Sequence, residues 1–159
     1  MSGQYHGRMK KELRFFARMA LRRHKPDLVV AGGALGWDQA LAWATLDLGI
    51  PLTLVLPFRG MESRWEPDMR AEFKRMVELA QTVECLGETF DMDLYQARNV
   101  RMVDESEGVL GMWDGRKFGG TFNCLRYAHT QEKRVYHLWQ EWEDWWPRRV
   151  QPQETRSTG

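Results

Sequence analysis

The sequence predicts a Rossmann-like α/β fold, with three α/β/α layers built around a mostly parallel sheet of about five strands. Short apolar runs alternate along the chain with longer helical segments, a pattern typical of parallel sheets covered on both faces. Two glycine-rich turns, Gly32–Gly36 and Gly119–Thr121, each follow an expected strand and open an expected helix. The length of 159 residues fits one domain, and the net charge of +1 gives no strong field toward nucleic acid or an anionic membrane.

The expected elements follow from apolar periodicity and from the residues that end them. The first helix covers residues 4–24 and ends before Pro26, which cannot continue the helical hydrogen bonds. Gly49 stands where the second helix should end, and Pro67 suits the first turn of the third. The expected strands are 28–30, 52–56, 82–86, 108–113 and 134–138, and the remaining helices are 38–48, 67–80, 93–104 and 121–130.

A tryptophan-rich segment closes the expected domain, which spans residues 1–146. Trp142, Trp145 and Trp146 fit one helical face that docks on the body of the domain or at a subunit contact. Residues 147–159 are rich in Pro, Arg, Gln, Ser and Thr, a composition typical of a disordered tail.

The two glycine turns predict a phosphate-binding site. A helix N-terminus has unpaired N–H groups and a partial positive charge, and glycines let an anion approach that backbone closely. Both turns, and the loop after Pro57, fall at the carboxyl ends of expected strands, where open parallel sheets bind ligands. A nucleotide is therefore the expected ligand.

The first turn has its own alternative interpretation. Gly32-Gly33-Ala34-Leu35-Gly36 matches neither the dinucleotide fingerprint nor the P-loop, so glycines that serve packing explain it equally well. Asp38 is either a helix-start residue favoured by the dipole or an acceptor for a ribose hydroxyl.

The order of motifs along the chain resembles the YpsA family of the SLOG superfamily, which also holds DprA-like proteins and LOG phosphoribohydrolases. The similar segments are 32–40, 50–51, 57–65, 95–104, 113–115 and 119–123. This resemblance covers roughly residues 10–138. It implies a Rossmann-like domain that binds a nucleotide or a nucleotide-derived, ADP-ribose-like ligand.

The resemblance also implies a strand ahead of the first helix. Family members open with a strand ending in Thr-Gly-His-Arg or a similar run, whereas Met1–Gln4 alone precede the helix here and His6-Gly7-Arg8 is a poor echo of that run. The first strand of a doubly wound sheet is central, so we expect a seam of unpaired backbone groups where it is missing. Two alternatives stay open: the chain begins at a late start site, or another segment or subunit fills the gap. The tryptophan-rich segment is one candidate cover for this seam.

The second turn offers further candidate ligands. Gly119 and Gly120 fit phosphate contact, and Thr121 fits either a phosphate contact or a helix cap. Asp114 is either an ordinary turn residue or a ribose ligand, and Asn123 either contacts ligand or faces solvent.

Four other residues gain weight from the resemblance. Glu62 and Trp65 lie in the loop after the second strand, where Trp65 either stacks on a base or covers the sheet edge. Arg98 and Asn99 lie on the helix 93–104, where Arg98 is either a phosphate ligand or a solvated arginine. The full set of candidate ligand-binding residues is Gly32, Gly33, Ala34, Gly36, Asp38, Glu62, Trp65, Arg98, Asn99, Asp114, Gly119, Gly120, Thr121 and Asn123.

Three functions stay open at this point. Binding or sensing of a nucleotide or ADP-ribose-like ligand leads, with no cofactor required. The first alternative is a nucleoside 5'-monophosphate phosphoribohydrolase that cleaves the N-glycosidic bond, with Glu62, Asp38 and Asp114 as weak catalytic candidates. The LOG motif Pro-Gly-Gly-x-Gly-Thr-x-x-Glu places a carboxylate that this chain lacks after its Gly-Gly-Thr, and such cleavage needs one nearby. The second alternative is a DprA-like accessory protein that binds single-stranded DNA, disfavoured by the near-neutral charge.

Partners and location follow from what the sequence lacks. We expect a small-molecule nucleotide partner, no membrane and no metal, and a homodimer is the oligomer we consider. Without an apolar signal segment the expected location is the cytoplasm. Cys85 and Cys124 are too few for a disulfide scaffold, and we expect both to be buried, unreactive thiols.

Overall fold

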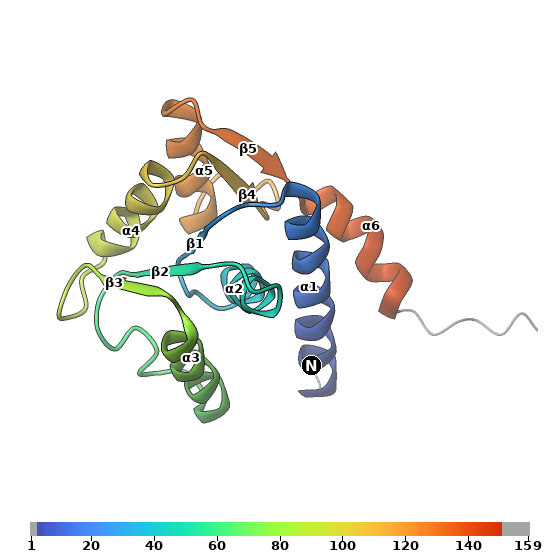
Figure 1. Ribbon diagram of the computed structural model, residues 1–159, viewed down its shortest axis with the longest axis horizontal. Coiled ribbons are helices and arrows are strands. Elements are labelled where there is room, and N and C mark those ends of the chain that lie inside the picture. The colour runs from blue at the N-terminus through green and yellow to red at the C-terminus, as the bar shows by residue number, and fades with distance from the viewer. Residues whose placement is uncertain (1–2, 151–159) are drawn as a thin grey trace, which may run out of the picture.

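The computed structural model describes residues 3–150 as six helices and five strands (Figure 1). The elements are α1 (Gly3–His24), β1 (Val29–Ala31), α2 (Trp37–Asp47), β2 (Leu52–Leu56), α3 (Pro67–Leu79), β3 (Thr82–Cys85), α4 (Asp93–Asp104), β4 (Gly108–Gly111), α5 (Gly120–Thr130), β5 (Arg134–His137) and α6 (Trp139–Val150).

All paired strands are parallel, but they form two sheets. β1, β2 and β3 are hydrogen-bonded in that order, with Val29 opposite Leu52, and β4 pairs with β5 alone. The Rossmann-like class and the parallel direction are confirmed, whereas the expectation of one continuous sheet is wrong. No strand within residues 3–150 pairs with strands of both sheets.

The helices lie in two layers on either side of the strands. α2 packs between α1 and α3, while α4 packs beside α5 and these two contact β2, β4 and β5 (Figure 1). A parallel strand must be reached by a crossover, and α2, α3, α4 and α5 are the crossovers between consecutive strands. This places the turns that follow β1 and β4 at the same edge of the strands, as the sequence predicts.

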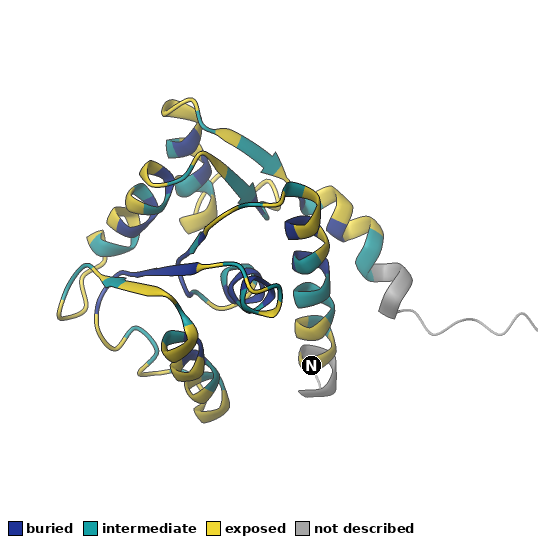
Figure 2. Ribbon diagram, in the orientation of Figure 1, coloured by how far each residue is buried: buried dark blue, intermediate teal, exposed yellow. Residues whose placement is uncertain are grey.

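The main core surrounds β2, whose five residues are all buried (Figure 2). Leu52 and Leu54 are 1% and 0% exposed, and Phe73 and Met76 of α3 pack against the same cluster. Continuous burial is typical of a parallel strand with helices on both faces.

A second apolar cluster joins α1 to α6. The Phe16 ring lies 5.5 Å from the Trp142 ring, edge to face, and Ala20 and Leu138 are buried beside them. Trp145 and Trp146 pack against the same cluster, which confirms that the tryptophan face of α6 docks on the domain.

Two local expectations differ from the structure. α6 continues past Pro147 to Val150, where we expected the tail. The rest of the expected tail lies outside the described residues. Cys85 is exposed rather than buried, because β3 is the outer strand of its sheet. Cys124 is half-buried, and burial raises the pKa of its thiol to about 11.

Neither a membrane span nor a metal cluster is found between residues 3 and 150. No helix there is long and apolar enough to cross a bilayer. No group of three or more His, Cys, Asp or Glu side chains there is arranged to hold a metal ion.

Candidate functional site

The two glycine turns are held side by side by two consecutive residues of α4. Arg98 Nη1 donates to the carbonyl oxygen of Gly32 at 3.2 Å, and Asn99 Nδ2 donates to the carbonyl oxygen of Gly120 at 3.3 Å. Both side chains are buried, at 7% and 4% exposure. One dipeptide therefore ties the residue that follows β1 to the start of α5.

The first three carbonyl oxygens of the first turn accept hydrogen bonds from the protein. Gln39 Nε2 donates to Gly33 O at 3.2 Å and the Gln39 backbone N–H donates to Ala34 O at 3.2 Å, while Gly32 O accepts from Arg98. No side chain of the described chain caps α2, whose N-cap is Gly36. The first turn thus engages its oxygens internally and leaves the start of α2 without a side-chain cap.

A buried charge pair lies beneath Gly32. A β-carbon at this position would come within 2.9 Å of Asp38 Oδ2 and 3.1 Å of Arg98 Nε, so no larger residue fits. Burial raises the pKa of the Asp38 carboxyl, and the Arg98 charge and a backbone hydrogen bond from Ala34 oppose that rise. The pair explains why the turn needs glycine here.

Arg98 is neither a solvated arginine nor fully bonded. Its Nε is buried without a hydrogen-bond partner among the described residues, and its guanidinium lies 5.6 Å from the centre of the Tyr95 ring. A buried donor without an acceptor is costly, and it commonly marks a site that a water or ligand completes. The predicted phosphate role of Arg98 stays a prediction, supported by this free donor.

The second turn is the more open of the two. Gly119 is the N-cap of α5 with φ 95°, and no side-chain hydrogen bond caps that helix. Thr121 therefore does not cap α5, and its side chain is exposed, as is that of Asn123. A β-carbon on Gly120 would have no neighbour within 4 Å. Open space in front of Gly120 is the geometry that an approaching anion needs.

Asp114 shapes the loop before the second turn. Its Oδ1 accepts from the Arg116 backbone N–H at 3.1 Å, and its Oδ2 pairs with Arg116 Nε at 2.9 Å. Trp113 Nε1 donates to Arg116 O at 2.8 Å in the same loop. These contacts match the ordinary turn interpretation, and the ribose role stays a prediction.

The loop after β2 supports the covering interpretation of Trp65. The Trp65 ring contacts the Phe73 ring edge to face at 5.3 Å and packs against the main core. The Glu62 backbone carbonyl accepts a hydrogen bond from the Trp65 backbone N–H, and Glu62 lines a groove against α3 with Arg70 and Lys74.

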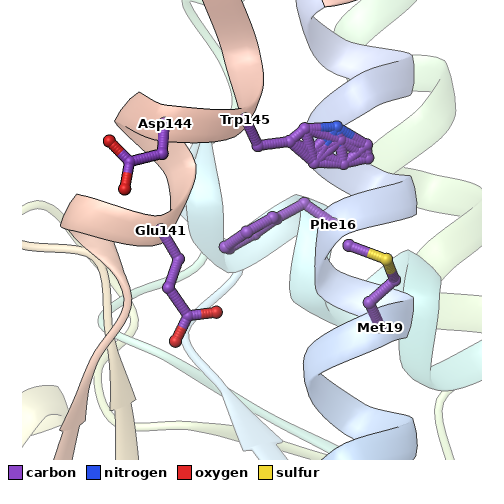
Figure 3. Close-up of a pocket in the computed structure, with 5 residues that line it drawn as sticks. All are labelled: Phe16, Met19, Glu141, Asp144 and Trp145. Atoms are coloured by element: carbon purple, nitrogen blue, oxygen red, sulfur yellow. The ribbon is translucent and has the colours of Figure 1, made fainter. Parts of the chain in front are cut away.

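A separate hollow lies between α1 and α6 (Figure 3). Phe16 and Met19 line one side of it, and Glu141, Asp144 and Trp145 line the other. None of these is a predicted site residue, so the hollow is distinct from the glycine turns.

Sequence reasoning missed two residues that build the site. Gln39 holds two carbonyls of the first turn, and Tyr95 lies against the Arg98 guanidinium. Both fall inside motifs that the sequence analysis quoted, but their side-chain direction has no sequence signal.

The order and geometry of these motifs agree with a family match. Residues 9–141 match the YspA SLOG family, which is most of the chain. The chain belongs to the YspA SLOG family. A curated relative, the uncharacterized SPbeta prophage-derived protein YoqJ of Bacillus subtilis (strain 168), is 34% identical over 131 residues, 71% of this chain and 73% of the relative.

A solved structure shares the fold of this SLOG domain. DNA processing protein A (DprA) from Streptococcus pneumoniae superposes with a TM-score of 0.55 at 17% identity, over 86% of this chain. The domain spans 46% of the DprA chain. At this identity the likeness shows the fold alone.

Proposed function

We propose that this SLOG domain binds or senses a nucleotide or a nucleotide-derived, ADP-ribose-like ligand across its two glycine turns. The observation that carries the proposal is the tie of both turns to Arg98 and Asn99, which links the turn ahead of α2 to the start of α5, two helices without a side-chain cap. Unpaired N–H groups at both turns suit a ligand with more than one phosphate. The ligand phosphates lie on the amides of the two turns, with Arg98 Nε as a further donor.

The carboxylates and exposed polar groups of the turns have separate roles in this proposal. The Thr121 side chain does not cap α5, and its hydroxyl donates a hydrogen bond to a phosphate oxygen. Asp114 accepts a ribose hydroxyl at the rim. Burial raises the pKa of the Asp38 carboxyl and the nearby Arg98 charge opposes that rise, so the Arg98 charge offsets the repulsion between an ionised Asp38 and a bound anion.

The first experiment identifies the ligand. Purified protein is denatured, and any released nucleotide is identified by mass spectrometry. The melting temperature is then measured with AMP, ADP, ADP-ribose and inorganic phosphate. A ligand at about one hundred times its Kd adds about 2.7 kcal/mol, or about 5–11 °C for a chain of this size. No release and no shift with any of these compounds would overturn the proposal.

A glycine substitution separates ligand contact from folding. Gly120→Ala places a methyl group in open space at a position without positive φ, so the ligand-free protein gains about 0.4–1 kcal/mol in stability. The same methyl blocks the approach of a phosphate, so the ligand-induced shift is lost. Gly7→Ala is the matched control, because its β-carbon also meets open space on α1. It keeps the full ligand shift.

Catalysis and DNA binding are outcomes of the same experiments. Among the described residues no carboxylate follows Gly120 in the first turn of α5, and the Asp114 carboxylate is already paired with Arg116. Release of free base from AMP would show that the protein hydrolyses the nucleotide rather than only binding it. A salt-dependent mobility shift with single-stranded DNA would instead support DNA binding, in line with the DNA processing that the name of DprA states.

A further inference from the structure

The second glycine turn presents an aromatic ring to solvent. Phe118 lies directly ahead of Gly119, the N-cap of α5, and is 72% exposed. This is the highest exposure among the large apolar side chains that the structure describes. Phe90, at 66%, packs edge to face on Phe58 with the ring centres 5.4 Å apart, whereas Phe118 has no ring partner within the described chain.

The usual structural role of an apolar residue ahead of a helix is not available to Phe118. Such a residue commonly packs against the fourth helical residue, a contact called the hydrophobic staple. Ahead of α2, Leu35 has the apolar Ala40 at that position. In α5 the fourth residue is Asn123, which is polar and exposed. The helix start therefore gives no structural reason for an aromatic residue at position 118.

The backbone on both sides of Phe118 borders open space. A β-carbon on Gly115, Gly119 or Gly120 would meet no atom within 4 Å. The first backbone hydrogen bond into α5 runs from the Asn123 N–H to Gly119 O at 3.0 Å, so the N–H groups before Asn123 have no acceptor inside the helix. A flat group can thus lie against the ring while a phosphate attached to it reaches these N–H groups.

The surroundings of the ring favour a small ligand over a protein partner. Arg116 and Lys117 come directly before Phe118, and both are charged and exposed. The apolar area at this point is therefore a single ring, whereas protein partners use contiguous apolar patches of several hundred Å².

We propose that Phe118 is the stacking platform for the base of the bound nucleotide. The inference rests on the proposed function, in which the ligand phosphates lie on the amides of the two glycine turns. It narrows the ligand class to nucleotides whose base contributes to affinity, and it excludes sugar phosphates and inorganic polyphosphates as equal ligands. An aromatic ring stacks on any base, because every base has a π-face. Purines should bind more tightly than pyrimidines, since their larger ring system covers more of Phe118.

The test compares ligands with and without a base. Isothermal titration calorimetry on the full chain measures the Kd of ADP, UDP and pyrophosphate. Phe118→Leu keeps an apolar side chain but removes the ring, so ADP affinity should fall about 5- to 150-fold, the range for one stacked base. Pyrophosphate has no base and should bind both proteins equally. Phe118→Trp restores a ring and should keep ADP binding.

A control variant and a second measurement separate stacking from a general effect on the turn. Phe90→Leu removes a ring of similar exposure from another loop, and it should leave ADP affinity unchanged. Stacking on an aromatic ring shifts the adenine H2 and H8 resonances upfield in NMR spectra. The shift is expected with the wild-type protein and with Phe90→Leu, and it should vanish with Phe118→Leu.

The results distinguish a failure of this inference from a failure of the proposed function. Equal ADP affinity of the wild type and Phe118→Leu would overturn the stacking role and leave nucleotide binding in place. Equal weakening of ADP and pyrophosphate would also overturn it, because the side chain would then act on the shape of the turn. If the wild type binds none of the three compounds, both proposals fail. Loss of binding to a single-stranded oligonucleotide with ADP affinity unchanged would assign the ring to nucleic acid and overturn this inference.

Discussion

Replacing Arg98 with methionine tests how far the first glycine turn depends on one buried guanidinium. Arg98 is 7% exposed, donates to Gly32 O at 3.2 Å, and opposes the burial that raises the pKa of Asp38. Methionine keeps an unbranched apolar side chain but removes both the donor and the charge. The substitution should therefore loosen the turn from α4 and leave Asp38 without its opposing charge.

The expected loss is worked from these two contacts. Leaving Gly32 O without a donor costs about 1–3 kcal/mol, and an unpaired buried carboxylate adds to it, for a total of about 2–4 kcal/mol near neutral pH. Because the folded pKa of Asp38 is raised, stability is fully present below its unfolded pKa and is lost as pH rises through the folded pKa. Removing Arg98 raises that pKa further. The penalty is thus larger at about pH 8 than at about pH 5.

Urea unfolding followed by circular dichroism at both pH values measures the penalty. Arg98→Met is compared with Asp38→Asn, with the double variant, and with Arg101→Met as a control. Arg101 lies on the same helix but is exposed, paired with Glu84 and Glu105, so its loss should change stability little. Asp38→Asn should remove most of the pH dependence of the Arg98→Met penalty. A penalty equal at both pH values, or no larger than that of Arg101→Met, would refute the buried charge pair.

Three other predictions concern reactivity, pH and packing. A thiol reagent at about pH 8 should label exposed Cys85 quickly and Cys124 slowly, because the Cys124 pKa is about 11; equal rates would contradict this. Hydrogen bonds from Arg14 and Arg18 lower the pKa of Asp47 in the folded protein. The stability that Asp47 contributes is therefore present above its unfolded pKa and is lost as pH falls through its folded pKa. Asp47→Asn should flatten the acid side of a stability–pH curve from urea unfolding, and an unchanged slope would count against the pair. Trp142→Ala should cost about 3–5 kcal/mol in urea unfolding, and a loss under about 1 kcal/mol would show that α6 is dispensable.

Most of the fold could be predicted because its signals are local. Pro26 and Pro67 set helix boundaries, and Gly49 ends α2 with φ 68°. Apolar runs placed all five strands to within two residues. The division of the strands into β1-β2-β3 and β4-β5 was not predicted, because pairing between strands depends on tertiary packing.

The contacts of the site could not be predicted, because they join residues far apart in the sequence. Arg98 and Gly32 are 66 positions apart, and Asn99 and Gly120 are 21 apart. The sequence marks Arg98 and Asn99 as unusual, but it gives no sign that both bond turn carbonyls. That role depends on how α4 crosses the strand ends, which only tertiary packing determines.

The glycines of the two turns can now be separated by what each one is for. Gly32 is required by the fold, because Asp38 and Arg98 leave no room for a β-carbon. Gly36 and Gly119 are required by backbone geometry, with φ of 92° and 95°. Gly120 meets neither demand, and alanine in its place would stabilise the free protein. Gly120 lies at the start of α5 in the second turn and can be replaced without strain, so Gly120 rather than the more recognisable first turn is the sharper test of ligand binding.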